Sequence, residues 1–159
     1  MQIDKNIRPV IPTDMPSLKT VIEANDLFPS NMLDEMIFDY FNNKNSNDLW
    51  LTYEDNQPVA IAYCVPERMT EGTWNLLLIA VHPDYQGKGC GTSVLNYIEQ
   101  MLAARGERLL LVETSNLDSF ELTQAFYLKC GFEKEAQIRE FYQAGEDKIV
   151  FRKLLTDIK

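Results

Sequence analysis

The sequence predicts an α/β (α+β) fold in which helices cover both faces of one mixed, mostly antiparallel, seven-stranded sheet. Two observations lead to this class. Strand-like and helix-like hydrophobic patterns alternate along the chain, in the order β-α-α-β-β-β-α-β-α-β-β. In the middle, a buried strand, an amphipathic helix and a second buried strand follow one another, which implies a right-handed crossover between a central parallel pair. No repeat or long linker interrupts the pattern, so residues 1–159 are predicted to form a single domain.

The first elements are a strand and two helices. The strand is expected over Ile3–Arg8. A helix-start signal at residues 12–14 places Thr13 at the N-cap of a helix that continues to about Ala24. A second amphipathic helix follows, and its apolar residues at helical spacing are Leu33, Ile37, Phe38 and Phe41.

Three strands are predicted next. Residues 49–53 and 59–65 form a hairpin across the turn residues at 54–56. The segment Thr73–Val81 is almost continuously apolar, which is typical of a strand that is covered on both faces. Pro83 ends this strand because proline cannot donate to a sheet.

The second half begins with an amphipathic helix that ends near Gly106. A buried strand follows at 109–112, and a further helix is closed by Gly131 in the left-handed conformation. The chain ends in a hairpin of the strands 132–142 and 148–155.

Composition narrows the function classes. Apolar residues make up 45% and charged residues 25% of the chain, as is usual for a soluble globular protein. The net charge of −9 without a basic stripe argues against a nucleic-acid partner. No apolar stretch is long enough to span a membrane and no secretory signal is visible, so we expect a cytoplasmic protein without a membrane partner. The three cysteines are widely spaced and lack a C-x-x-C pair, so neither a metal site nor a disulfide is predicted.

The most informative segment is QGKGCGT at residues 86–92, between a buried strand and a helix. The N-terminus of a helix leaves several N–H groups unpaired, and the helix dipole favours negative charge there. The glycines allow the backbone to approach a phosphate closely. Lys88 can add a positive charge and Thr92 a hydroxyl donor, whereas Cys90 is expected to contribute its backbone rather than a nucleophilic thiol. The segment therefore predicts a turn that binds a pyrophosphate.

Two other phosphate-binding loops fit the same segment less well. A Walker loop needs Gly-Lys-Ser/Thr after four intervening residues, and Lys88-Gly89 does not satisfy this. A dinucleotide fingerprint counted from Gly87 has Thr92 in place of its third glycine, although Glu107 lies near the distance expected for the acidic residue. A nicotinamide-dependent oxidoreductase is thus a distant alternative.

Two motifs resemble those of a known family. The segment VHPDYQGKGCG at 81–91 resembles the acetyl-CoA signature of the GNAT acetyltransferase superfamily, Gln/Arg-x-x-Gly-x-Gly/Ala after V-x-P. The segment AFYLKCGF at 125–132 resembles the family's a-x-x-F/L-Y-x-x-x-G-F motif. Both have the family's order and approximate separation, and the predicted element order matches its fold over almost the whole chain. The T-W-x-L and E-T-S segments and the acidic hairpin at 141–147 resemble an uncharacterised subgroup of this superfamily.

The resemblance implies that acetyl-CoA is a co-substrate. The pantetheine arm would pair with the exposed backbone of a splayed strand at Ile79, Ala80 and Val81. The pyrophosphate would lie on the signature turn, whose cofactor-binding residues would be Gln86, Gly87, Lys88, Gly89, Cys90, Gly91 and Thr92.

Two side chains acquire catalytic roles from the same resemblance. Tyr127 matches the tyrosine that protonates the departing thiolate, and a phenol with a pKa of about 10 suits this donation. Glu113 resembles the glutamate with which some members deprotonate the amine, directly or through water. The alternatives are a purely structural core tyrosine and a solvated carboxylate at a strand end.

Other residues depart from the family pattern or suggest weaker hypotheses. Many members have asparagine seven residues before the tyrosine, where this chain has Phe120, and Asn116 lies too far away to take its place directly. His82 is the only histidine and is expected to be a solvated loop residue. A cationic amine could meet acidic residues of the first two helices, although helical surface charge is usually solvated; these are Asp26, Asp34, Glu35 and Asp39.

The predicted function is therefore that of an enzyme, an acetyl-CoA-dependent N-acetyltransferase whose primary-amine acceptor is a small molecule or a peptide. The amine would attack the thioester directly in a ternary complex. The alternative is a module of the same fold that binds CoA or acyl-CoA without turnover. Dimerisation is common in the family, so a homodimer is compatible with the resemblance, but no sequence feature specifies it.

Overall fold

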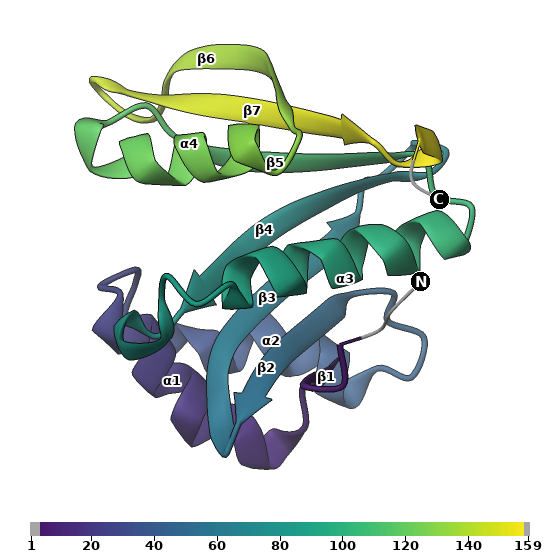
Figure 1. The fold of residues 1–159 in the computed structure, drawn as a ribbon, viewed down its shortest axis with the longest axis vertical. Coiled ribbons are helices and arrows are strands. Elements are labelled where there is room, and N and C mark those ends of the chain that lie inside the picture. Colours follow the sequence, from purple (N-terminus) through teal and green to yellow (C-terminus); the bar gives the residue numbers. More distant parts are fainter. Residues whose placement is uncertain (1–3, 158–159) are drawn as a thin grey trace.

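The fold is described from a computed structural model, in which residues 4–157 are described. Its sheet has seven strands in the order β1-β2-β3-β4-β5-β7-β6 (Figure 1). Among the strand pairs of residues 4–157, only β4 and β5 are parallel, so the predicted mixed, mostly antiparallel sheet with a central parallel pair is confirmed. The strands and α-helices are β1 (Ile7–Pro9), α1 (Met15–Ala24), α2 (Met32–Asn42), β2 (Leu49–Asp55), β3 (Gln57–Pro66), β4 (Thr73–Val81), α3 (Cys90–Ala104), β5 (Leu109–Ser115), α4 (Glu121–Lys129), β6 (Glu133–Gln143) and β7 (Glu146–Leu154).

The start of the chain differs most from the prediction. The strand β1 is short, and the predicted first residue, Ile3, lies outside the described residues. Thr13 is not an N-cap, because it lies inside a short 3-10 helix and Asp14 immediately precedes α1. The carboxylate of Asp14 accepts two hydrogen bonds of 2.8 Å from the guanidinium of Arg8 and one of 2.8 Å from the N–H of Ile11. This ion pair fixes the connection between β1 and α1 in place of the expected threonine cap.

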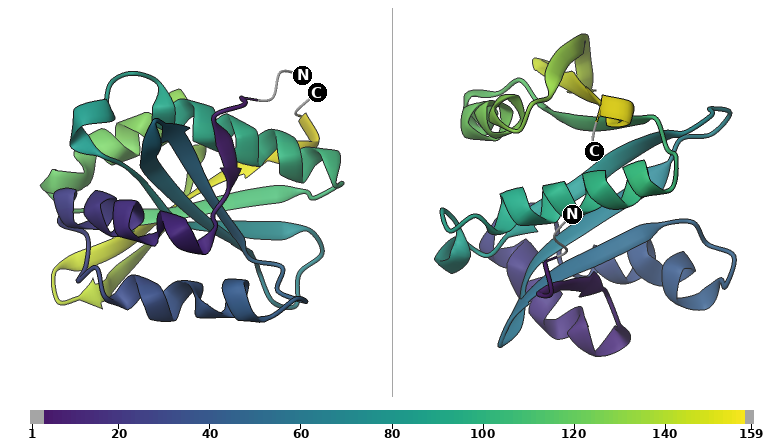
Figure 2. Two further views of the ribbon diagram at one scale, coloured as in Figure 1. Left: turned by 90° about the horizontal axis from the view of Figure 1, so that it is seen from below. Right: turned by 45° about the vertical axis from the view of Figure 1, so that its right-hand side comes forward.

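Helices cover both faces of the sheet (Figure 2), and a separate core lies on each face. On one face, α3 and α4 cover a core to which they contribute, among others, Val94, Leu95, Ile98, Leu102 and Tyr127. On the other face, α1 and α2 contribute Leu18, Val21, Ile22, Leu33 and Ile37. The main sheet contacts of α1 and α2 are with β2, β3 and β4, so these helices cover only one half of their face.

The central strands β4 and β5 stay together over a short distance only. They pair from Thr73 with Leu109 to Leu76 with Val112, and beyond this point β4 continues without β5 (Figure 1). The register of β4 against β3 shifts at the same place, which leaves Leu77 as an extra, half-exposed residue of β4. A bulge of this kind bends a strand and increases its twist. It accounts for the divergence of β4 from β5.

None of the helices among residues 4–157 combines the length and hydrophobicity that a transmembrane span requires.

Candidate active site

The divergence leaves one backbone edge of β4 unpaired by β5. Ile79, Ala80 and Val81 pair with β3 on their other side, and all three follow the point at which β5 departs. At the end of the strand, the carbonyl of Val81 already accepts hydrogen bonds from Asn25 Nδ2 (3.0 Å) and Gln86 Nε2 (2.9 Å). The edge can therefore pair with an extended polar chain before Val81, while the carbonyl of Val81 itself is used inside the protein.

The glycine-rich turn at the end of β4 leads directly into α3. Gly87 (φ 75°) and Gly89 (φ 86°) have positive φ angles, which glycine adopts without strain. No atom lies within 4 Å of the position that a Cβ would take at either residue. Gly89 is the N-cap of α3 and has no side-chain cap, so the first N–H groups of the helix point outward without a helical partner. The turn thus combines unpaired donors, a helix N-terminus and open space.

Gly91 has a different role from its two neighbours in the motif. Its φ angle is not positive, and a Cβ here would lie 3.5 Å from Phe126 Cζ and 3.8 Å from Val81 Cγ2. These are ordinary contact distances. The small residue therefore lets the start of α3 approach α4, and it brings the turn and the second motif together.

The other residues of the turn are held in distinct ways. Gln86 Nε2 also donates to Asn25 Oδ1 (3.1 Å), which fastens the turn to the C-terminal end of α1. Lys88 Nζ lies 5.4 Å from the ring centroid of Tyr85 and makes no ion pair among the described residues, so its charge is available. Burial raises the pKa of Cys90, which fits the expectation that its thiol is not a nucleophile. Asn25 was missed by the sequence analysis because nothing in a helix end identifies a partner in a distant loop.

Tyr127 lies on α4 and is only 3% exposed. Its ring centroid lies 5.9 Å from that of Phe132 and 5.8 Å from that of Phe151. Burial raises the pKa of Tyr127, so the phenol keeps its proton at neutral pH. The phenol therefore carries the proton that a departing thiolate would need, although its raised pKa makes it a weaker acid than the ordinary phenol assumed in the sequence analysis.

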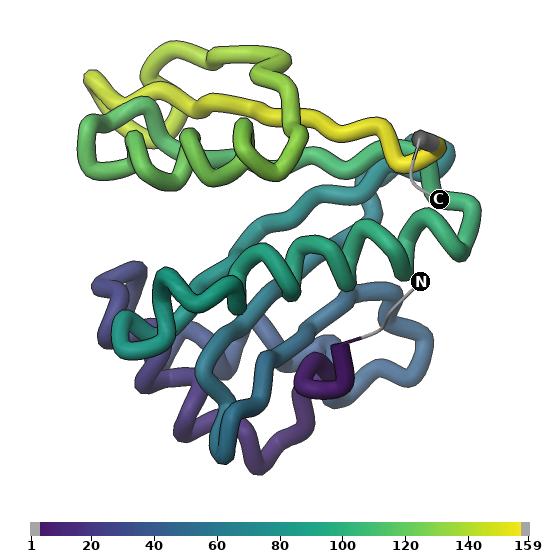
Figure 3. The backbone as a smooth tube through the Cα atoms, viewed as in Figure 1, coloured from purple at the N-terminus to yellow at the C-terminus, as the bar shows by residue number. Residues whose placement is uncertain are grey.

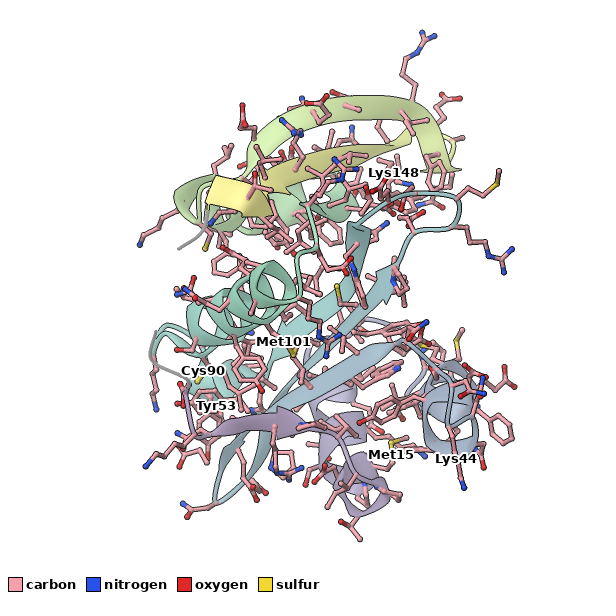
Figure 4. All side chains as sticks on the ribbon, turned by 90° about the vertical axis from the view of Figure 1, so that its right-hand side faces the viewer. Met15, Lys44, Tyr53, Cys90, Met101 and Lys148 are labelled. Carbon is pink, nitrogen blue, oxygen red and sulfur yellow. The ribbon has the colours of Figure 1, made fainter. Side chains whose placement is uncertain are left out.

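Glu113 lies on β5 just beyond the last residue that pairs with β4. Its Oε2 lies 3.0 Å from Lys148 Nζ and accepts a hydrogen bond of 2.8 Å from Asn75 Nδ2. Asn75 Nδ2 also donates to Glu67 Oε1 at 3.2 Å. The predicted base is thus part of a four-residue polar cluster, and its other three members were not found by the sequence analysis. Figure 4 shows Lys148 beside the β6–β7 pair and Cys90 at the start of α3.

Aromatic residues reach the same cluster from a bulge in β6. The register of β6 against β7 is interrupted between Ile138 and Gln143, where β6 arches away (Figure 3). Within the arch, the ring of Phe141 lies 4.1 Å from Lys148 Nζ. Burial, followed by the negative charges of Glu113 and Glu146, raises the pKa of Tyr142. Both aromatic side chains therefore lie next to the Glu113–Lys148 pair.

Asp147 holds the arch in shape. Its Oδ1 accepts a hydrogen bond from the N–H of Glu140 (2.9 Å), which has a positive φ of 54°, and its Oδ2 accepts one from Gln137 Nε2 (2.7 Å). The N–H of Asp147 donates to Asn116 Oδ1 (2.7 Å). Asn116 is therefore occupied with the β6–β7 hairpin, which argues against a transfer of the family's cofactor-contacting asparagine to this residue.

A cavity of about 490 Å³ adjoins the polar cluster at Glu67. Its charged lining residues are Asp48, Glu67, Glu107 and Arg105. Glu107, which the dinucleotide alternative required, accepts a hydrogen bond of 2.7 Å from Trp74 Nε1. Three carboxylates and one guanidinium make this cavity acidic.

Two weaker candidates have local partners. His82 Nδ1 accepts a hydrogen bond of 3.1 Å from the N–H of Asp84 and thereby caps the 3-10 helix Pro83–Tyr85. Among the acidic helix residues, Asp34 forms an ion pair of 2.8 Å with Lys19. Both observations agree with structural roles.

The comparisons with known proteins agree with this geometry. A family model described as an acetyltransferase (GNAT) domain matches residues 45–134. A comparison with curated proteins by sequence found no match. Among solved structures, a protein from Desulfovibrio desulfuricans described as an acetyltransferase of the GNAT family is 30% identical, with a TM-score of 0.87 over 94% of this chain and 98% of its own.

Two more distant structures share the fold. The ribosomal-protein-S18-alanine N-acetyltransferase from Escherichia coli is 23% identical, with a TM-score of 0.74 over 94% of this chain and 92% of its own. An aminoglycoside 6'-N-acetyltransferase complexed with coenzyme A is 16% identical, with a TM-score of 0.74 over 94% of this chain and 96% of its own. The match of the family model and the similarity to the Desulfovibrio protein together establish that this chain belongs to the GNAT acetyltransferase family.

Proposed function

We propose that this protein is an N-acetyltransferase that transfers the acetyl group of acetyl-CoA to a primary amine. The observation that carries the proposal is the divergence of β4 from β5 next to an open glycine turn at the start of a helix. A free strand edge and a set of unpaired N–H groups suit the two polar parts of one long ligand, an amide-containing arm and a pyrophosphate. We also propose that residues 1–159 form a single domain.

The cofactor-binding residues in this proposal lie on one continuous segment. Ile79 and Ala80 would pair with the pantetheine arm through their backbone, and Val81 would mark the end of that edge. Gly87, Gly89 and the amides that open α3 would hold the pyrophosphate, assisted by the charge of Lys88. Gln86, Cys90, Gly91 and Thr92 complete the segment: Gln86 and Gly91 shape it through internal contacts, and Cys90 and Thr92 would offer their backbone N–H groups.

The catalytic roles in this proposal fall on two side chains, Glu113 on β5 and Tyr127 on α4. Glu113 would accept a proton from the acceptor ammonium, so that the amine nitrogen can attack the thioester carbon. The new C–N bond forms as the C–S bond breaks, and Tyr127 would give its proton to the departing sulfur. The nitrogen loses its second proton and the phenolate is reprotonated, so the products are an N-alkylacetamide, CoA thiol and one proton.

The surroundings of Glu113 favour a positively charged acceptor. Glu67 and Glu113 outnumber Lys148 in the cluster, and the adjoining cavity is acidic. An ammonium group is therefore attracted to the surroundings of Glu67 and Glu113. A small polyamine and the amine of a peptide both satisfy this description.

The three cysteines are free, which fits the reducing conditions of the cytoplasm.

Thiol release with a panel of amines tests the proposal. Purified protein is mixed with acetyl-CoA and each amine, and the acetylated product is identified by mass spectrometry. We expect CoA release that depends on a primary amine, together with a product that is heavier by one acetyl group. Tight binding of acetyl-CoA without transfer to any amine would instead support a non-catalytic acyl-CoA-binding module.

A further inference from the structure

We infer that Asn75 is an acceptor-binding residue: its Oδ1 receives a hydrogen bond from the acceptor ammonium, while its Nδ2 holds Glu113 beside that ammonium. The inference rests on the proposed function, because it names the residue that would meet the acceptor. It assigns a role to a side chain that neither family motif contains.

The orientation of the Asn75 amide is fixed by its neighbours. Its Nδ2 lies 2.8 Å from Glu113 Oε2 and 3.2 Å from Glu67 Oε1. Carboxylates only accept hydrogen bonds, so the NH2 group must face them and the oxygen must face elsewhere. Exchange of the two amide atoms would place three oxygens together and is excluded.

This orientation leaves Oδ1 of Asn75 without a donor. The residue is only 4% exposed, and Oδ1 is buried without a hydrogen-bond partner among the described residues. Buried polar atoms nearly always have partners, and an exception calls for an explanation such as a missing ligand. An N–H donor in contact with Glu113 would satisfy this oxygen.

Lys148 occupies the position at Glu113 that the acceptor ammonium would take. It contacts Oε2 of Glu113, the same oxygen to which Asn75 donates, so a donor that takes the place of Lys148 lies beside Asn75. The side chains of Lys148 and Glu113 are 13% and 22% exposed, so the pair can be reached from solvent. Lysine has a long, flexible stem. An acceptor ammonium can therefore replace the Lys148 ammonium at Glu113 and reach Asn75 in the same step.

The position on β4 suits this role. Asn75 is opposite Leu111 of β5, in the last stretch before the two strands diverge, and the bulged residue Leu77 follows two positions later. The cluster therefore lies at the closed end of the gap along which the cofactor arm would run. A nitrogen bound there faces the end of that arm.

Two substitutions in the cluster should have opposite effects on the KM for the amine. Asn75→Leu removes the acceptor atom and should raise this KM about 10-fold. Lys148→Met removes the competing ammonium and should lower it about 3-fold. Both variants should bind acetyl-CoA with the wild-type Kd. A merely structural role would not move the two KM values in opposite directions.

Each variant has a matched control. Thr52→Val removes another buried polar side chain, whose hydroxyl donates to the carbonyl of Ala60 at 2.7 Å, far from the cluster. Lys153→Met removes the other lysine of β7 that is paired with a glutamate, Glu99, on the opposite face of the sheet. Neither control should change the KM for the amine by more than about 2-fold. Equal effects of cluster variants and controls would overturn the inference.

A binding measurement separates failure of this inference from failure of the proposed function. The side-chain amide signal of Asn75, assigned by its absence in Asn75→Leu, is followed by NMR with CoA present. Butylammonium chloride should shift it at neutral pH, and uncharged 1-butanol should not. If the protein acetylates amines but this signal moves with neither probe, or equally with both, the inference is wrong and the function stands. If the signal moves with butylammonium only and no amine is acetylated, Asn75 does bind an ammonium ligand and the proposed function is wrong.

Discussion

The two sides of the strand gap are built in different ways. The candidate cofactor side is one continuous stretch of backbone, from Ile79 through the glycine turn to the first residues of α3. The candidate acceptor side is assembled from side chains on β4, β5, β7 and the arch of β6, together with Glu67, which follows β3. The first depends on glycine conformation and the second on tertiary packing. Mutations on the cofactor side should therefore change the affinity for acetyl-CoA, and mutations on the acceptor side should change the affinity for the amine.

The largest effect is expected at the turn. Gly89→Glu places a negative side chain at a helix N-terminus that would hold a pyrophosphate, and it also forces an L residue into a φ of 86°. We expect the affinity for acetyl-CoA to fall at least about 1000-fold, which corresponds to ~4 kcal/mol. Isothermal calorimetry measures this loss.

The control for this variant lies at the other end of the same helix. Gly106 has a φ of 82°, and no atom lies within 4 Å of its Cβ position. Gly106→Glu therefore adds the same charge and the same strain away from the turn. If both variants bind acetyl-CoA equally well, the turn does not bind its phosphates.

The next largest effect is expected at Tyr127, which lies on α4. Tyr127→Phe keeps the ring packing and removes the proton donor, so kcat should fall about 100-fold. The Kd for acetyl-CoA should stay within about 2-fold, because the ring remains in place. Stopped thiol-release assays and calorimetry give the two values.

Tyr40→Phe is the matched control for this tyrosine. The hydroxyl of Tyr40 donates to the carbonyl of Val10 at 2.9 Å, in the opposite helical layer. Its loss should leave kcat unchanged. Equal kcat values for Tyr127→Phe and the wild type would remove Tyr127 from the chemistry.

A smaller effect is expected at the arch of β6. Asp147→Ala removes the acceptor of the Glu140 N–H and Gln137 hydrogen bonds, so Phe141 and Tyr142 should lose their fixed positions beside Lys148. The KM for the amine should rise about 5-fold, while binding of acetyl-CoA stays the same. Asp55→Ala, in the hairpin between β2 and β3, serves as a control that should leave both constants unchanged. If Asp147→Ala changed the affinity for acetyl-CoA instead, the cofactor and acceptor sides would not be independent of each other.

The smallest effect concerns pH. Hydrogen bonds from the N–H of Glu140 and from Gln137 lower the pKa of Asp147. The carboxylate of Asp147 therefore binds a proton less readily in the folded protein than in the unfolded chain. Its two hydrogen bonds, which we call the clasp, stabilise the arch fully at pH values above the ordinary aspartate pKa. This stabilisation is lost as the pH falls through the lowered native pKa. The amide shift of Glu140 should titrate with a midpoint below about 3.9, whereas the amide of Gly89 should not follow it. A midpoint at or above that value would show that the clasp does not form in solution.

The same contrast explains what the sequence alone could predict. The strand Thr73–Val81, the turn and α3 follow from local rules on hydrophobic runs, proline and glycine, and they occur where they were expected. The cap of α1 was predicted wrongly at Thr13 because Arg8 holds Asp14 from another element. Asn75, Glu67 and Lys148 carry no local signal, since each is an ordinary polar residue in or directly after a strand. Their importance appears only when the sheet register brings them to Glu113.

The interruption of β6 was also beyond a local analysis. The sequence predicted a regular hairpin, and residues 132–142 do carry a strand-like pattern. The arch arises because Asp147 on the neighbouring strand competes for the amide of Glu140. Such a competition depends on two segments that are adjacent only in the folded sheet.

One side chain connects the first helix to the candidate cofactor-binding turn. Asn25 closes α1, and its amide bonds to the last carbonyl of β4 and to Gln86 in the turn. Any displacement of α1 has to stretch these hydrogen bonds or carry the turn along with it. The position of α1 and the geometry of the candidate phosphate-binding turn are therefore coupled.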